Sequence, residues 1–432
     1  MTNILIMFIV FMALLFLGIP VVFALGTASL IWLLTMNPVG IPASVAAQTM
    51  MSQMLSFALI AMPGFLFVGR MMNTSGVTDR LLKFSVAVVG RYRGGLAHAN
   101  ALASMLFASM SGNAVADAGG LGLVEMDMMT KAGYKRDFSA GITAASSILG
   151  PIIPPSAIMV LVGSISSISV ASLFYGGIIP GILLTGAMMG FIALRAVLTK
   201  EGRSWPKTVM PWREALKTVP QAIPPLMTFV IIIGSIMGGI CTPTEAAVLA
   251  VWWSIILGIC YKELTWKGLW ETLTDTVRTA GVFMLLMSVA SFFAWIVTIE
   301  GLPQALRGIL GALAGNSQTL MFLVCTVVFL IIGCFLDTAS AALLLTPIVI
   351  PAVTSLGIDP VHFAIVMIIA LIMGAITPPF GLCLFVVADV GGVPVRRVTA
   401  EALKYLPSML IVLLLVILYP QLVTWLPQVL LK

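Results

Sequence analysis

Two apolar stretches of this chain are interrupted by pairs of adjacent prolines. The first, residues 146–160, reads SSILGPIIPPSAIMV, and the second, residues 373–381, reads MGAITPPFG. Proline removes a helix hydrogen bond and clashes with the preceding turn, so the backbone must unwind at each pair. Unwound carbonyl groups are tolerated at membrane depth only where they are buried in protein or line a wet cavity. The pattern therefore predicts two broken helices whose bare carbonyls face the protein interior.

Composition places these segments in a membrane. Of the 432 residues, 60% are hydrophobic and 9% are charged, with a mean hydropathy of +1.14. The apolar runs are long and unbroken, which excludes a soluble fold and favours an all-α polytopic membrane protein over a β-barrel. We expect membrane spans near 3–17, 20–35, 54–72, 156–169, 174–197, 221–239, 244–261, 281–299, 381–391 and 405–429.

Two segments differ from ordinary spans. Residues 96–130 and 319–353 each consist of two apolar arms that meet at a polar tip, Ser111-Gly112-Asn113 and Asp337-Thr338. Each arm is shorter than the ~20 residues that a full crossing needs. We predict two re-entrant helical hairpins.

The chain repeats itself. A spacing of 224 positions separates Asn113 from Asp337, Gly150 from Gly374 and Pro154 from Pro378, and pairs further upstream have nearly the same spacing. A constant offset over so many residues predicts two copies of one unit. We assign the first repeat to 1–197 (hairpin about 96–130, broken helix about 137–169), a linker to 198–218, and the second repeat to 219–432 (hairpin about 319–353, broken helix about 361–391).

Charge gives the orientation of the two copies. The first hairpin is flanked by Arg91, Arg93, Lys131, Lys135 and Arg136, whereas the near flanks of the second contain no Lys or Arg. The positive-inside rule places the first hairpin base and the linker in the cytoplasm and the second hairpin base outside. The repeats are then inverted, and both termini lie outside.

Two shorter amphipathic stretches, roughly 77–90 and 302–313, belong to none of the predicted spans, hairpins or broken helices. Surface helices at the membrane interface are the simpler interpretation. In a transporter with a moving domain, the same helices could be arms that join a fixed scaffold to a mobile core. The sequence does not separate these alternatives.

The tips and breaks offer hydroxyl, amide, carboxylate and carbonyl oxygens, which suit Na⁺ rather than a transition metal. The candidate ligands of a first sodium site are Ser109, Ser111, Asn113, Gly150, Ile153 and Pro155. Those of a second are Gly333, Asp337, Thr338, Gly374, Thr377 and Pro379. Intramembrane carboxylates are costly and usually functional, so Asp337 is the strongest single candidate.

An anionic substrate could be held by free N–H groups at helix N-termini and by nearby polar side chains. The candidates are Asn113, Asp117, Ser156, Asp337 and Thr338. Arg70 and Arg278 lie near the ends of spans, and we expect them to be interfacial anchors. The two histidines are far apart in sequence and the five cysteines are scattered, which disfavours a metal site built on either.

The motifs SGNAVAD (111–117), GPIIPPS (150–156) and TPPFG (377–381) resemble those of the large membrane subunit of tripartite ATP-independent periplasmic (TRAP) transporters, the DctM-like family. The likeness runs over nearly the whole chain. It implies an elevator-type, Na⁺-coupled transporter of the ion-transporter superfamily, with one Na⁺ between the first tip and the first break and another in the mirrored place. One departure is Asn113, where many members of the family carry serine.

The resemblance also implies partners and a location. These are a small four-helix membrane subunit (Q-type), expected as a separate chain, a periplasmic substrate-binding protein (P-type) that delivers an organic acid, and the bacterial inner membrane. Nucleic acid is not expected, because the basic residues lie in short loops. The acid would be a C4-dicarboxylate, a sialic acid or a related carboxylate.

Other functions remain open at this point. A stand-alone Na⁺/dicarboxylate symporter of related fold would need no binding protein. A channel is less consistent with hairpins that approach from both sides. An intramembrane enzyme would need a catalytic set, such as paired histidines or a Ser/Lys dyad within a span, and the sequence offers none.

Overall fold

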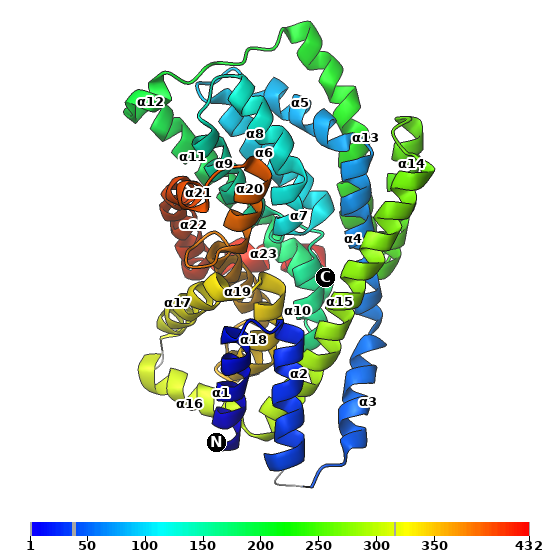
Figure 1. Cartoon of the computed structure of the whole chain (residues 1–432), viewed down its shortest axis with the longest axis vertical. Coiled ribbons are helices and arrows are strands. Elements are labelled where there is room, and N and C mark those ends of the chain that lie inside the picture. The colour runs from blue at the N-terminus through cyan, green and yellow to red at the C-terminus, as the bar shows by residue number, and fades with distance from the viewer. Residues whose placement is uncertain (1, 37–39, 315–316, 432) are drawn as a thin grey trace.

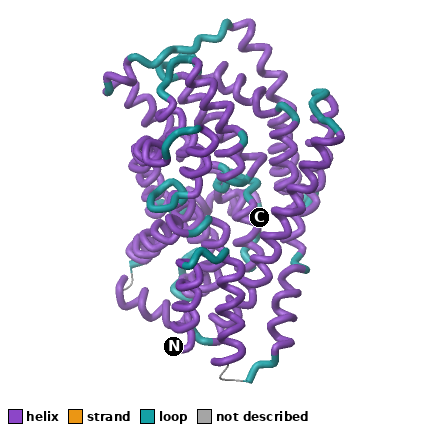
Figure 2. Tube along the Cα trace, in the orientation of Figure 1, coloured by secondary structure: helices purple, strands orange, loops and turns teal. Residues whose placement is uncertain are grey.

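The structure, a computed structural model, describes residues 2–36, 40–314 and 317–431, and helices joined by short loops make up most of these ranges (Figures 1 and 2). No strand occurs in these ranges, which confirms the all-α expectation. Five helices are long and apolar enough to cross a membrane: α11 (Val170–Leu198), α13 (Trp212–Met237), α14 (Pro243–Cys260), α15 (Trp266–Ile299) and α17 (Gln318–Phe335). Two bent helix pairs would raise the number to seven. The chain is therefore a polytopic membrane protein.

The first predicted hairpin is three helices rather than two plain arms. Helix α6 (Gly95–Ser111) leads to the tip, and the return arm is split into α7 (Ala114–Gly119) and α8 (Leu121–Lys131). The first broken helix follows as α9 (Arg136–Ser146), a short 3₁₀ turn (Ser147–Leu149), an irregular stretch, and α10 (Ala157–Ser166). The helix ends where the prolines remove its hydrogen bonds.

The second hairpin has a continuous return arm. Helix α17 leads to the tip at Asp337, and α18 (Thr338–Thr354) returns from it. The second broken helix consists of α19 (Pro360–Gly374) and α20 (Leu382–Gly391), with the Pro378–Pro379 stretch between them. Helix α18 also packs against α10, so the second hairpin contacts the first broken helix.

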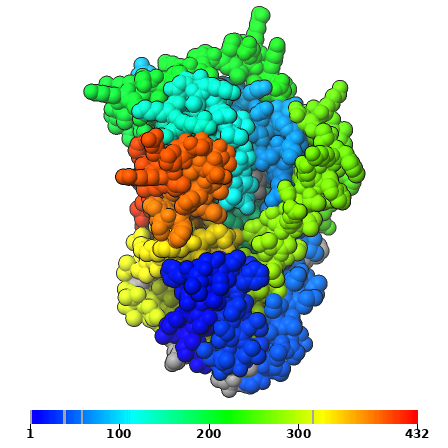
Figure 3. All heavy atoms as spheres, viewed as in Figure 1, coloured from blue at the N-terminus to red at the C-terminus, as the bar shows by residue number. Residues whose placement is uncertain are grey.

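A separate group of helices packs on α15. It contains α2 (Val21–Ile31), α3 (Ala43–Met54) and α4 (Phe57–Thr74), and α14 lies along α4. Figure 1 shows α4, α13, α14 and α15 together on one side of the molecule. In the space-filling view the amino-terminal helices, including α1 (Thr2–Phe16), form the lower part of the visible surface (Figure 3).

The two amphipathic stretches are helices α5 (Val77–Val89) and α16 (Leu302–Ala314). Helix α5 packs between α6 of the first hairpin and α13, and α16 packs on α18 of the second hairpin and on α15. Helix α5 also contacts α4, so each amphipathic helix touches one hairpin and either α15 or a helix packed on it. These contacts are compatible with both of the roles expected from the sequence.

Several boundaries differ from the predicted spans. The span predicted at 405–429 is two helices, α22 (Leu406–Leu418) and α23 (Gln421–Leu430), because Pro420 interrupts it. Helix α13 begins at Trp212, inside the predicted linker, and α15 begins fifteen residues before the predicted span at 281–299. Helix α3 has no counterpart among the predicted spans. These helical turns contain polar residues, so they do not form the long apolar runs that predict a membrane span.

Candidate functional site

Both hairpin tips are capped in the same way. Asn113 Oδ1 accepts hydrogen bonds from the backbone N–H groups of Val115 (2.9 Å) and Ala116 (3.4 Å) at the start of α7. Asp337 Oδ1 accepts them from Ala339 (3.1 Å) and Ser340 (3.2 Å) at the start of α18. Asn and Asp are favoured at this position because their short side chains reach these free N–H groups. The amide and the carboxylate are thereby fixed in equivalent places.

The first tip lies directly against the first break. A Cβ on Gly112 would be 2.5 Å from the carbonyl oxygen of Pro155, and Gly112 has a φ of +59°, so only glycine fits here. A Cβ on Gly150 would be 2.6 Å from Asp117 Oδ2 and 3.2 Å from the carbonyl oxygen of Asn113. The Pro155 carbonyl thus lies against the tip at Gly112, and the buried Asp117 carboxylate and the Asn113 carbonyl lie against the break at Gly150.

The second break makes a similarly close contact with the end of α17. A Cβ on Gly374 would be 2.4 Å from the carbonyl carbon of Gly333, and a Cβ on Gly333 would be 2.3 Å from the carbonyl oxygen of Leu371. The N–H of Gly381 donates to the carbonyl of Cys334 at 3.4 Å. Gly333 of the second hairpin and Gly374 of the second broken helix, both predicted for the second sodium site, are therefore in contact.

One cavity of about 400 Å³ joins both tips and both breaks. Its lining includes Asn113 and Asp337 with Thr338 from the tips, and Pro151 and Ala375 from the breaks. Arg70 of α4, with Thr279 and Phe283 of α15, closes it from the other side. Residues from six separate stretches of the chain thus face one volume.

The remaining predicted residues whose side chains the structure describes are not part of the lining of this cavity. Ser156 caps α10, and its hydroxyl donates to the carbonyl of Pro151 at 2.6 Å, so this hydrogen bond lies within the first break. Thr377 donates to the carbonyl of Met373 at 2.9 Å. Ile153 packs its side chain on Gly181 of α11. Pro379 is exposed. The side chains of Ser109 and Ser111 are outside the part of the chain that the structure describes.

The donor atoms near the tips are oxygens. Among the described residues there is no cluster of three or more His, Cys, Asp or Glu side chains that could hold a metal ion. Backbone carbonyls and single carboxylates are ligands for hard cations, and transition metals prefer nitrogen and sulfur. The oxygen donors at the tips and breaks are therefore of the kind that a hard cation such as Na⁺ takes.

Arg70 also lines the cavity, which the sequence did not predict. We expected an anchor at the membrane interface, but its side chain lines the cavity, donates to Thr279 Oγ1 at 2.6 Å and pairs with Asp275 at 3.3 Å. The sequence carried a signal for this position. Arg70 lies in an apolar helix, and such intramembrane charges usually face a partner or a cavity.

A second polar group was also missed. Asn100 on α6 donates to Glu125 Oε2 of α8 at 2.6 Å and to Thr143 of α9 at 2.8 Å, and it accepts from Ser146 at 2.9 Å. All four side chains are buried. The network ties the first hairpin to the first broken helix, and so holds the tip against the break.

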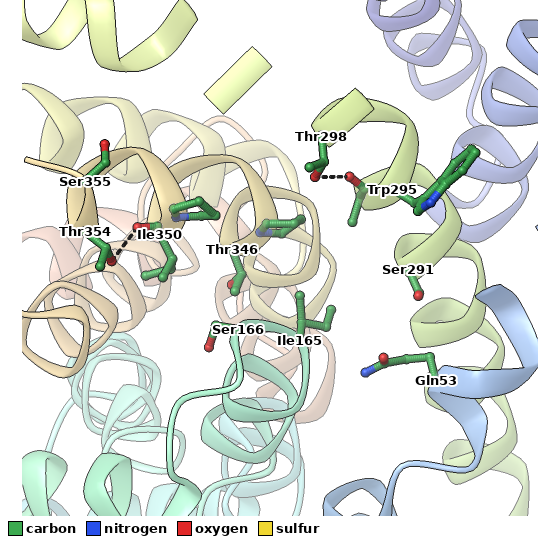
Figure 4. Close-up of a pocket in the computed structure, with 13 residues that line it drawn as sticks. Gln53, Ile165, Ser166, Ser291, Trp295, Thr298, Thr346, Ile350, Thr354 and Ser355 are labelled. Carbon is green, nitrogen blue, oxygen red and sulfur yellow. Dashed lines mark hydrogen bonds between the residues drawn. The ribbon is translucent and has the colours of Figure 1, made fainter. Parts of the chain in front are cut away.

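A second, larger cavity of about 640 Å³ lies further along α15 (Figure 4). Gln53 and Ser291 face Ser166 and Thr346 across it in the close-up. Its lining is rich in hydroxyl groups and carries no charged side chain among the described residues. Both cavities therefore lie between α15 and the pair α10–α18.

Comparison with known proteins agrees with these features. Residues 8–422 match the family described as "Tripartite ATP-independent periplasmic transporter, DctM component". The chain is 40% identical to the sialic acid TRAP transporter large permease protein SiaM of Vibrio cholerae, covering 96% of both chains. It is 33% identical to the C4-dicarboxylate TRAP transporter large permease protein DctM of the same species, covering 98% of this chain and 97% of the relative.

Among solved structures, the chain resembles the YdaH transporter of Alcanivorax borkumensis. The TM-score is 0.63 at 17% identity, over 87% of this chain and 88% of the transporter, which is a likeness of fold alone. The sequence relatives are permease subunits rather than enzymes, as expected. This chain belongs to the DctM component family of tripartite ATP-independent periplasmic transporters.

Proposed function

We propose that this chain is the permease subunit of a Na⁺-coupled importer of an organic acid. The observation that carries the proposal is the single cavity lined by both hairpin tips and both broken helices. Asn113, Asp117 and Asp337, with the carbonyls of the two breaks, would hold Na⁺, and the cavity between them would hold the acid. Bound Na⁺ would offset the negative charge of Asp337 and allow an anion to approach.

The acid we favour is a sialic acid, because the chain is more similar to the sialic acid permease from Vibrio cholerae than to the C4-dicarboxylate permease of that species. A cavity of about 400 Å³ also lies within the usual range for small-molecule sites. A C4-dicarboxylate is the alternative. A periplasmic binding protein would deliver the acid, and a small membrane subunit would complete the permease.

We further propose an elevator mechanism with inverted repeats. The hairpins and broken helices would move as one body against the helices packed on α15. The equivalent caps at Asn113 and Asp337 support the repeat. The two cavities between α15 and the pair α10–α18 support a sliding interface. They show that the helices on its two sides are not closely packed along their whole length. In this arrangement the chain lies in the inner membrane with its first hairpin base in the cytoplasm and both termini in the periplasm.

Uptake into proteoliposomes tests the proposal. We expect accumulation of radiolabelled N-acetylneuraminate that requires an inward Na⁺ gradient, the small subunit and the binding protein. The matched control replaces Na⁺ with K⁺ at equal ionic strength. Uptake that is unchanged in K⁺ would disprove Na⁺ coupling, and Na⁺-driven uptake by this chain alone would identify a stand-alone symporter.

A further inference from the structure

The wall of the tip-and-break cavity formed by α4 and α15 carries a positive charge. Among the described residues that line the cavity, Arg70 is the only basic one, and Asp337 on the opposite wall is the only acidic one. Thr279 and Phe283 complete the wall beside Arg70. An occupant would thus meet a carboxylate tip on one side and a guanidinium group on the other.

Two contacts hold the guanidinium group of Arg70 in place, but they do not occupy all of its N–H donors. Its Nη2 donates to Thr279, and its Nη1 lies 3.3 Å from Asp275 Oδ2. A guanidinium has five N–H donors. The side chain of Arg70 remains 34% exposed, and that of Asp275 is 55% exposed. The two contacts therefore orient the group and leave part of it open to the cavity.

A structural role alone accounts poorly for this arrangement. An ion pair between partly exposed side chains contributes little to stability. A charged side chain in an apolar helix is costly and usually faces a partner or a cavity. A planar guanidinium, in contrast, matches a carboxylate through two parallel hydrogen bonds.

We propose that Arg70, oriented by Thr279 and Asp275, is an anion subsite that binds the carboxylate group of the transported acid. This inference rests on the proposed function, because it assumes that an organic acid enters the cavity. Arg70 would select for acids by charge, and Asp275 would release the guanidinium when the substrate carboxylate replaces it. Na⁺ held near Asp337 would bind at the opposite wall.

The test compares an acid with its neutral analogue. Proteoliposomes containing the complete transporter would be assayed for uptake of N-acetylneuraminate and of its C1 methyl ester. In Arg70→Gln the KM for the acid should rise by about 10- to 100-fold, the range expected for a lost charge-assisted hydrogen bond. The KM for the ester should change by less than about threefold, and Arg70→Lys should fall between wild type and Gln. Asp275→Asn should lower the KM for the acid.

Arg278→Gln is the matched control, because Arg278 is an exposed arginine of α15 outside the cavity lining and should leave both KM values unchanged. Equal losses for acid and ester in Arg70→Gln, or no change in either, would overturn the subsite. If wild type transports neither compound, the assignment of a sialic acid as the substrate fails. Thermal stabilisation of the purified chain by N-acetylneuraminate or succinate then decides the inference. Stabilisation of wild type but not of Arg70→Gln would support the subsite, and its absence in wild type would reject it.

Discussion

The two hairpins have the same tip geometry and different chemistry. Each tip residue accepts hydrogen bonds from the second and third following N–H groups, but Asn113 is neutral and Asp337 is charged. The first hairpin carries its carboxylate one turn later, at Asp117, where Oδ2 lies against Gly150. A shared backbone frame can thus support two oxygen-rich sites whose negative charge comes from different positions.

The hairpins also differ in how their arms and breaks are buried. The first hairpin contains the Asn100–Glu125 network, and the Pro154–Pro155 stretch of the first broken helix, which it touches, is buried. The second has arms packed through apolar side chains such as Phe322 and Phe329, and Pro378 and Pro379 are exposed. The first site is therefore fixed by polar contacts in the interior, whereas the second lies nearer the surface.

Removing the charge at the second tip should have the largest effect. In Asp337→Asn the cap on α18 is kept, since Asn is an equally good cap, but the carboxylate ligand is lost. We expect the initial rate of uptake at low Na⁺ to fall about 100-fold, as for the loss of a charged ligand worth about 3 kcal/mol. Raising the Na⁺ concentration should restore part of the rate.

Asp359→Asn is the control for this substitution. Asp359 is also a capping carboxylate, accepting from the N–H of His362 at 2.8 Å, but it caps the start of α19 at the hairpin base. Uptake by this variant should be close to that of wild type. If both variants lose the same activity, the special role of the second tip is wrong.

The difference between the hairpin arms should appear in stability. Asn100→Leu leaves Glu125, Thr143 and Ser146 without their shared partner, at a cost of about 2–3 kcal/mol. The midpoint of thermal unfolding in detergent should fall by several degrees. In the second hairpin Thr326→Val removes a buried hydroxyl that has no partner among the described residues, so the change should be about 1 kcal/mol or less. Equal shifts would contradict the proposed difference between the arms.

The smallest effect is expected at the first tip. Asn113→Ser keeps an oxygen that can cap α7, and uptake should stay within about threefold of wild type. Asn113→Ala loses both cap bonds, which cost about 1 kcal/mol together, and uptake should fall about fivefold. Rates measured at saturating Na⁺ would compare the two variants. Equal rates would mean that the cap at Asn113 does not position this tip.

Much of the fold was predictable because the signals are local. The prolines at 154–155 and 378–379 interrupt apolar helices, whereas the pair Pro224–Pro225 lies inside the continuous helix α13. The polar tips stand out from apolar arms. The cavity was partly predictable, since the repeat pairs Asn113 with Asp337. Arg70 was not assigned to it, because its position near a span end favoured an interfacial anchor over a residue that faces the tips. The network at Asn100 was missed for a similar reason: its members come from three different helices.

The sequence by itself determined the class of protein, the two breaks and the two polar tips. These follow from hydrophobicity and from the missing hydrogen bonds of proline, which act over a few residues. The tertiary structure decided which groups meet. Gly112 and Gly150 allow the first tip to touch the first break, and α4 and α15 set Arg70 across the cavity from Asp337. Such contacts join residues distant in the chain, and they depend on how whole helices pack.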